Sequence, residues 1–190
     1  MLFVNLKRGL IIGMLCMVMP CFADDNLSKQ ATAFYSDNNH IKSMDLLLQI
    51  PIEERSAQDW LLLGNIAEDK EEYDNAFIMY KKAIEVDPKY YKAYYNLGNN
   101  SLKNGRHNMA IKYYKKALEY KKDNAYIYYN LACAYIKAGN LKKAKNALNN
   151  AIMYNSNVAE FHYNLAYVYS KLGKEKFAKT YLENYNKLAG

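Results

Sequence analysis

Proline, histidine and cysteine are scarce in this chain, which has three of each among its 190 residues. The histidines and cysteines are not spaced as a zinc site requires, and neither a glycine-rich phosphate loop nor a nucleophile elbow is present. The carboxylate pairs Glu53-Glu54 and Glu71-Glu72 fall at expected turns or helix starts, where they favour the helix dipole. The sequence therefore predicts no catalytic residues, no metal site and no cofactor.

Long apolar runs are also absent, since the uncharged run from Gly9 to Met19 is about half of the roughly 20 residues that a spanning helix needs. This run follows Lys7 and Arg8 and precedes Pro20-Cys21-Phe22-Ala23. The pattern is typical of a secretory signal peptide. We expect residues 1–23 to be removed after Ala23, which leaves an exported protein with no stable membrane insertion.

Two alternatives to cleavage stay open, a retained membrane anchor and lipidation. Lipidation is disfavoured because Pro20 precedes Cys21 and Leu15 precedes Cys16, where a lipoprotein has a small residue. Cleavage would also leave Cys133 as the single cysteine, so that no intramolecular disulfide forms. We expect Cys133 to be a small buried residue, and the alternative is a bridge to a partner thiol.

One five-residue phrase recurs every 34 residues between Trp60 and Ala166. Each copy has an aromatic residue or histidine first, leucine fourth and a small residue last. The copies are Trp60-Leu61-Leu62-Leu63-Gly64, Tyr94-Tyr95-Asn96-Leu97-Gly98, Tyr128-Tyr129-Asn130-Leu131-Ala132 and His162-Tyr163-Asn164-Leu165-Ala166. Alanines keep the same step in two further series, which are Ala76, Ala110, Ala144 and Ala178, and then Ala83, Ala117 and Ala151. Because one unit cannot bury both of its apolar faces alone, the period predicts stacked antiparallel helix pairs.

This pattern resembles the tetratricopeptide repeat (TPR) family. With Ala57 as the first place of a repeat, the aromatic falls at the fourth place, leucine at the seventh, a small residue at the eighth and Pro88 at the thirty-second. The resemblance implies an all-α solenoid, a right-handed superhelix with four repeats at residues 57–90, 91–124, 125–158 and 159–190. It also implies a binding scaffold rather than an enzyme.

The helices of these repeats are expected near residues 57–69, 73–86, 91–103, 107–120, 125–137, 141–154, 159–171 and 175–188. Gly105, Gly139 and Gly173 are expected to end the first helix of their pairs with positive φ. Residues 24–56 look like a degenerate N-terminal helix pair or cap, in which Ile41 and Leu48 fall at apolar places of the second helix. Ser56 and Asp59 predict a capping box for the next helix.

In a TPR superhelix the first helix of each pair lines a concave groove, so the resemblance implies a set of peptide-binding residues. An asparagine side chain offers both a donor and an acceptor to an extended peptide backbone, and tyrosine adds stiff apolar contact. The alternative is that the asparagines tie neighbouring helices together. Leu61, Tyr95, Tyr126 and Glu160 stand where a carboxylate clamp would have lysines, so a free C-terminal carboxylate is not the expected ligand. The implied groove residues are Asn65, Tyr95, Asn96, Asn99, Tyr126, Tyr129, Asn130, Tyr163, Asn164 and Tyr167.

Two outer surfaces also carry predictions. Lysines gather on the second helices, where they form either a solvated face or a surface attracted to an anionic envelope component or acidic partner. Nucleic acid is disfavoured by export. The last helix carries Tyr181, Leu182 and Tyr185, which we expect to contact a second copy or a partner, unless the tyrosine hydroxyls hydrate that face.

Taken together, these patterns predict an exported TPR scaffold that mediates protein–protein interaction in the bacterial cell envelope, periplasmic or envelope-associated, with secretion also open. We expect it to grip an extended peptide of a protein partner in its groove. The alternatives are a self-assembling structural envelope protein and a binder of an anionic envelope polymer.

Overall fold

The computed structural model describes residues 22–190, and this part of the chain is helical throughout, with no strand. The expected signal peptide, residues 1–23, lies outside the described residues except for Phe22 and Ala23, and it stays a prediction.

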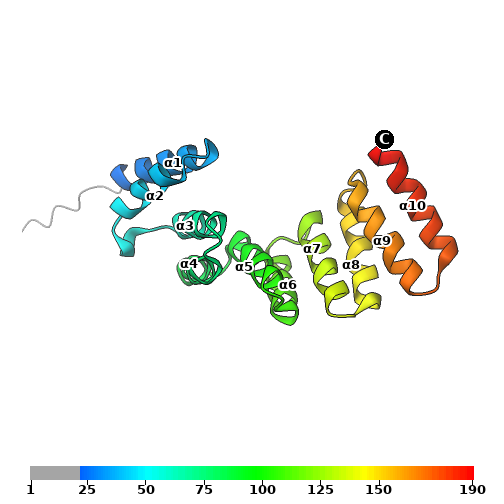
Figure 1. The fold of residues 1–190 in the computed structure, drawn as a ribbon. Helices are drawn as coiled ribbons and strands as arrows, with labels where there is room; N and C mark the ends of the chain where they lie inside the picture. Colours follow the sequence, from blue (N-terminus) through cyan, green and yellow to red (C-terminus); the bar gives the residue numbers. More distant parts are fainter. Residues whose placement is uncertain (1–21) are drawn as a thin grey trace, which may run out of the picture.

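Ten α-helices follow one another in sequential pairs and form an elongated row, with α1 and α2 at one end and α9 and α10 at the other (Figure 1). The all-α fold class is therefore confirmed. The helices from α3 onward have the predicted bounds, except that α10 ends one residue later. Their bounds are α1 Phe22–Ser36, α2 His40–Gln49, α3 Ala57–Asp69, α4 Tyr73–Val86, α5 Tyr91–Lys103, α6 His107–Tyr120, α7 Ala125–Lys137, α8 Leu141–Tyr154, α9 Ala159–Lys171 and α10 Glu175–Ala189, with a short 3-10 helix at Ile52–Glu54.

Small residues let the two helices of each repeat approach closely. Tyr80 of α4 is fully buried against Gly64 of α3, and Tyr114 of α6 is buried in the same way against Gly98 of α5. A β-carbon on either glycine would collide with the tyrosine ring. The third repeat has Ala132 at the place of the glycines and a buried Leu148 at the place of the tyrosines.

The turns inside the repeats need positive φ at one residue. Gly105, Gly139 and Gly173 have φ of 69°, 74° and 71°, as the sequence predicted. Glu71 occupies this place in the first repeat with φ of 61°, although a residue with a β-carbon adopts that conformation at a cost. The chain therefore keeps the same turn geometry with and without glycine.

The capping box at the start of α3 is confirmed. The Ser56 hydroxyl accepts from the backbone N–H of Asp59 at 3.2 Å, and the Asp59 carboxylate accepts from the backbone N–H of Ser56 at 2.8 Å. These two bonds satisfy donors that the helix start would otherwise leave open.

The prediction for the N-terminal pair is wrong at Ile41 and Leu48, which are 70% and 55% exposed. The buried face of α2 instead carries Ser43 and Leu47, followed by Ile50 just after the helix. The Ser43 hydroxyl donates to the carbonyl of Ala31 on α1 at 2.8 Å. A buried serine that is satisfied in this way lets α1 and α2 approach where a repeat would have alanine or glycine, and this turns Ile41 and Leu48 outward.

Candidate functional site

The first helices of the four repeats, α3, α5, α7 and α9, carry all ten predicted groove residues. We call the surface formed by these ten residues the groove. Their side chains are half-buried or exposed, and none is fully buried. The structure brings the asparagines and tyrosines of neighbouring repeats into contact, in a series of hydrogen bonds that run from one helix to the next.

In the first two of these junctions, asparagine bonds to asparagine. Nδ2 of Asn96 donates to Oδ1 of Asn65 at 2.7 Å. One repeat later, Nδ2 of Asn130 donates to Oδ1 of Asn99 at 3.0 Å and to the Tyr95 hydroxyl at 2.9 Å. The asparagines therefore do tie neighbouring helices together, which was the alternative to direct peptide binding.

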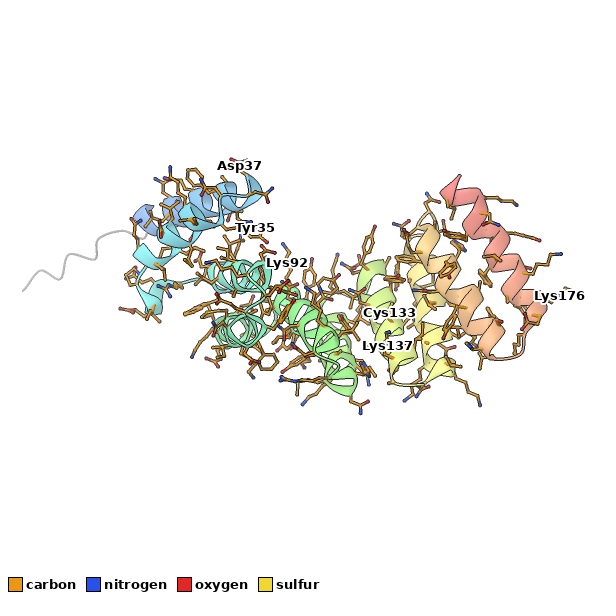
Figure 2. All side chains as sticks on the ribbon, in the orientation of Figure 1. Tyr35, Asp37, Lys92, Cys133, Lys137 and Lys176 are labelled. Atoms are coloured by element: carbon orange, nitrogen blue, oxygen red, sulfur yellow. The ribbon has the colours of Figure 1, made fainter. Side chains whose placement is uncertain are left out.

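The third junction has different partners. Nδ2 of Asn164 donates to the Tyr129 hydroxyl at 3.0 Å and lies 3.7 Å from Sγ of Cys133, which takes the place of Asn65 and Asn99. Cys133, marked in Figure 2, is half-buried rather than fully buried as predicted. Burial raises the pKa of its thiol above the usual value. Sulfur is a weak acceptor, so this junction has one strong bond fewer than the Asn130 junction.

Two tyrosines behind the groove complete the network. The Tyr80 hydroxyl lies 3.0 Å from Oδ1 of Asn65 and 2.7 Å from Oε2 of Glu68. The Tyr114 hydroxyl donates to Oδ1 of Asn99 at 2.7 Å. Burial raises the pKa of both tyrosines well above the ordinary value, so they stay neutral donors.

Sequence reasoning missed Tyr80 and Tyr114 as part of the site. The signal was present, because each of these tyrosines occurs in a repeat that has glycine rather than alanine at the eighth place and asparagine at the ninth. Where alanine replaces the glycine, leucine replaces the tyrosine and the ninth residue is Cys133 or Tyr167.

The carbonyl oxygens are what these asparagines leave open to a ligand. Both Nδ2 hydrogens of Asn130 have acceptors, and Nδ2 of Asn96 and of Asn164 is also engaged. Among the described residues, no side chain donates to Oδ1 of Asn96, Asn130 or Asn164. The groove thus offers a row of acceptors, one per repeat.

Two hollows lie along the groove. One of about 460 Å³ crosses α3, α5 and α7 and is lined in part by Leu61, Asn96 and Tyr126. The other, of about 360 Å³, lies between α9 and α10 and is lined in part by Tyr163, Tyr167 and Leu182. Tyr126 and Tyr163 are 53% and 51% exposed, so their rings are available to a ligand.

The three residues predicted as a C-terminal contact surface have different surroundings. Tyr181 is half-buried and stacks on Tyr169, with ring centroids 5.5 Å apart. Tyr185 packs on Tyr163 at 5.2 Å, and Leu182 lines the second hollow of the groove. The structure therefore joins Leu182 and Tyr185 to the groove and places Tyr181 between helices.

Other site types find no support within residues 22–190. This part of the chain holds no group of three or more histidine, cysteine, aspartate or glutamate residues that could bind a metal ion. Every helix in it is too short or too polar to cross a membrane.

Comparison with solved structures agrees with this architecture. MamA 41-end from Desulfovibrio magneticus RS-1 aligns with a TM-score of 0.78 at 17% identity, over 87% of this chain and 94% of that one. MamA MSR-1 gives 0.74 at 17% identity, over 88% and 97% of the two chains. A further crystal structure of MamA gives 0.67 at 27% identity, over 70% and 73%. At these identities the likeness concerns the fold.

Comparison with protein families gives matches to tetratricopeptide repeat models at residues 59–90, 79–112, 101–166 and 159–189. These matches together extend from residue 59 to residue 189. No family of enzymes is among them, and no curated protein matches the chain. The chain therefore belongs to the tetratricopeptide repeat family, whose members are mostly scaffolds that bind other proteins.

Proposed function

We propose that this chain binds an extended segment of a partner protein along the groove, as an exported scaffold of the bacterial cell envelope. The observation that supports peptide binding is the row of open carbonyl oxygens on Asn96, Asn130 and Asn164, each fixed by bonds from its own amide nitrogen to the preceding repeat. An extended peptide carries backbone N–H donors at a regular spacing, which suits a row of fixed acceptors.

Preorganisation is the physical advantage of this arrangement. Because the amide groups are already held by neighbouring helices, a ligand does not have to order them, and this lowers the entropic cost of binding. Tyr80 and Tyr114 hold the amides of the preceding asparagines from behind. The exposed rings of Tyr126, Tyr163 and Tyr167 then supply apolar contact to the side chains of the segment.

The test separates ligand contact from fold stability. Tyr126, Tyr163 and Tyr167 accept none of the hydrogen bonds from the asparagines, so changing all three to alanine should remove ligand contact while leaving that network intact. Linear peptides are first selected on the wild-type chain from a displayed random library, and their affinity is then measured by calorimetry. We expect the triple variant to lose at least tenfold in affinity while keeping most of its helical signal.

A matched control changes Tyr154, which is exposed to a similar degree on α8 and stacks on Tyr128 outside the groove. Tyr154→Ala should leave affinity unchanged. Equal affinity in the triple variant and the wild type would refute peptide binding in the groove.

Export and envelope location are the second part of the proposal. The support is the order of basic residues, apolar run and small residue in residues 1–23. Expression of the full chain in a bacterium followed by fractionation should give a mature protein that begins at Asp24 in the periplasmic fraction. An intact N-terminus by mass spectrometry would refute cleavage.

Self-assembly through the C-terminal repeat is a second candidate function. Phe177, Leu182 and Leu188 on α10 are each more than 40% exposed, which favours an apolar contact. Polar replacements of Tyr181, Leu182 and Tyr185 should then abolish dimers in sedimentation experiments, and persistence of the dimers would exclude this contact.

Binding of an anionic envelope polymer is a third candidate. A hollow of about 670 Å³ on α4, α5 and α6 is lined by Lys81, Lys112 and Lys115 together with Ile84 and Tyr113. Retention of the chain on such a polymer should fall with salt and with Lys112→Glu, and retention unaffected by both would exclude this candidate.

A further inference from the structure

Charge is distributed unevenly along the described chain. Residues 22–74 contain twelve acidic and four basic residues, whereas residues 75–190 contain seven acidic and twenty basic residues. The molecule is therefore acidic at the α1 end and basic over the remaining repeats, and the two ends are far apart in the elongated row (Figure 1).

This change of sign occurs at equivalent places of the repeats. Asp69 of the first repeat is replaced by Lys103, Lys137 and Lys171 at successive steps of 34 residues. Asp74 is followed by Asn108, Lys142 and Lys176, and Glu72 by Arg106, Asn140 and Lys174. All of these residues flank the turns inside the helix pairs. We call the surface formed by these turns and their flanking residues the turn edge.

Contacts show that the first three turns are adjacent. The Tyr35 hydroxyl, before the α1–α2 turn, donates to Oδ2 of Asp69 at 2.8 Å, and His40 after that turn lies 3.7 Å from the same atom. Lys103 of the α5–α6 turn pairs with Glu68 at 2.7 Å, and Arg106 approaches Asp74 at 4.0 Å. An acidic turn and a basic turn of this chain can therefore lie side by side and pair their charges.

The remaining charges of the turn edge have no such pairing. Within the described residues, Lys137, Lys142, Lys171, Lys174 and Lys176 make no ion pair with a carboxylate, and neither Asp37 nor Glu71 pairs with a cation. Figure 2 labels Asp37 near one end of the molecule and Lys137 and Lys176 farther along the row. The distance between the two groups prevents them from meeting within one copy.

We propose that the acidic part of the turn edge, at the α1–α2 and α3–α4 turns, docks on the basic part of the turn edge of a second copy, at the α7–α8 and α9–α10 turns. A second copy is favoured over other occupants because the complementary row is carried by the same chain. It also presents the kind of charged groups that Lys103, Arg106, Glu68 and Asp74 already pair within one molecule.

A single exposed ion pair contributes little, so the contact depends on a network of several pairs and on long-range attraction. It joins two different surfaces, and such a contact either closes into a ring or dimer or continues into a chain of molecules.

Sedimentation velocity with two charge-reversed variants tests the proposal. The first variant, Lys137→Glu with Lys171→Glu and Lys174→Glu, reverses the basic part. The second, Asp37→Lys with Glu71→Lys, reverses the acidic part, and none of these residues makes an ion pair that folding would lose. The control reverses Lys89, Lys112 and Lys122, which are exposed but lie away from the turn edge. Circular dichroism checks that each variant is folded.

At about 0.01 M salt, where the Debye length is about 30 Å, we expect the wild type and the control to associate. Both should dissociate at about 1 M salt, where that length is about 3 Å. Each reversed variant alone should stay monomeric. An equimolar mixture of the two should form heterodimers, because the intact acidic part of the first variant meets the intact basic part of the second.

Three results would overturn the proposal. A wild type that is monomeric at low salt excludes the contact. Association that is equal in all variants assigns it to another surface, such as the apolar face of α10. A monomeric wild type that sediments with vesicles of anionic phospholipid, and loses this binding in the first variant, assigns the basic part to a membrane surface instead.

Discussion

The ring of Tyr80 lies over Gly64, and the hydroxyl of that ring reaches Asn65 in the groove at 3.0 Å. A small residue on the first helix thus has a consequence for the concave surface. It lets an aromatic ring cross between the helices of the pair and place a hydrogen-bond donor behind a groove asparagine. Gly98, Tyr114 and Asn99 repeat this relationship one unit later.

A methyl group at Gly64 should therefore be poorly tolerated. Gly64→Ala would place its β-carbon against the Tyr80 ring, and we expect a loss of about 1–3 kcal/mol in the free energy of unfolding, as is usual for overpacking. Urea denaturation followed by circular dichroism measures this change.

The control for this prediction is present in the chain. Gly64→Ala combined with Tyr80→Leu recreates the pairing of Ala132 and Leu148 in the third repeat. The double variant should be more stable than the sum of the two single changes indicates, because the residues are in contact. Additive losses would show that the collision is relieved elsewhere.

The asparagine network predicts a graded series. Asn130→Ala removes hydrogen bonds to Oδ1 of Asn99 and to the Tyr95 hydroxyl, and should cost about 1–3 kcal/mol in the free energy of unfolding. Asn164→Ala removes one such bond and a weak contact to sulfur, so its cost should be smaller, about 1 kcal/mol. Chemical denaturation of both variants tests the order, and a larger loss for Asn164→Ala would contradict it.

Alkaline pH should weaken the attachment of the N-terminal pair. Burial, together with the Asp69 carboxylate, raises the pKa of Tyr35 from 10.0 to about 12. The folded state thus holds this proton more tightly than the unfolded state, so the contribution to stability is fully present below pH 10 and is lost as the pH rises through about 12.

Thermal melts of the wild type and of Tyr35→Phe measure this contribution at a series of pH values. The wild type should be more stable by a constant margin below pH 10, and the margin should vanish toward pH 12. A margin that is independent of pH throughout would mean that the Tyr35–Asp69 bond contributes nothing to stability.

The thiol of Cys133 should react slowly. Burial raises its pKa, so less thiolate is present at neutral pH than for an ordinary cysteine. Alkylation, followed by peptide mass mapping to separate Cys133 from Cys16 and Cys21, should accelerate when denaturant unfolds the chain. Fast labelling in the folded state would show that the groove opens at this junction.

The repeat period predicted the fold from α3 onward almost residue by residue. Glycine or alanine at the eighth place and glycine at three of the turns are steric requirements, so they are visible in the sequence. Ile41 and Leu48 were placed wrongly because α1 and α2 lack these small residues, and the buried hydroxyl of Ser43 takes over their role.

The groove was predictable as a surface but not as a network. Which residues line it follows from helix periodicity, whereas the partner of each amide depends on the spacing between helices of different repeats. The donor role of Tyr80 and Tyr114 was hidden because both lie on second helices, with the ring buried and only the hydroxyl reaching the groove.

The replacement of Asn65 and Asn99 by Cys133, and of Tyr80 and Tyr114 by Leu148, divides the solenoid mechanically. Directional polar bonds run through the junctions of the first three repeats, whereas the junction with the fourth depends more on non-directional apolar packing. Since stability in a repeat array is a sum over neighbouring interfaces, the array resembles a spring of two grades. Under tension the fourth repeat should yield first, while the groove of the first three keeps its curvature.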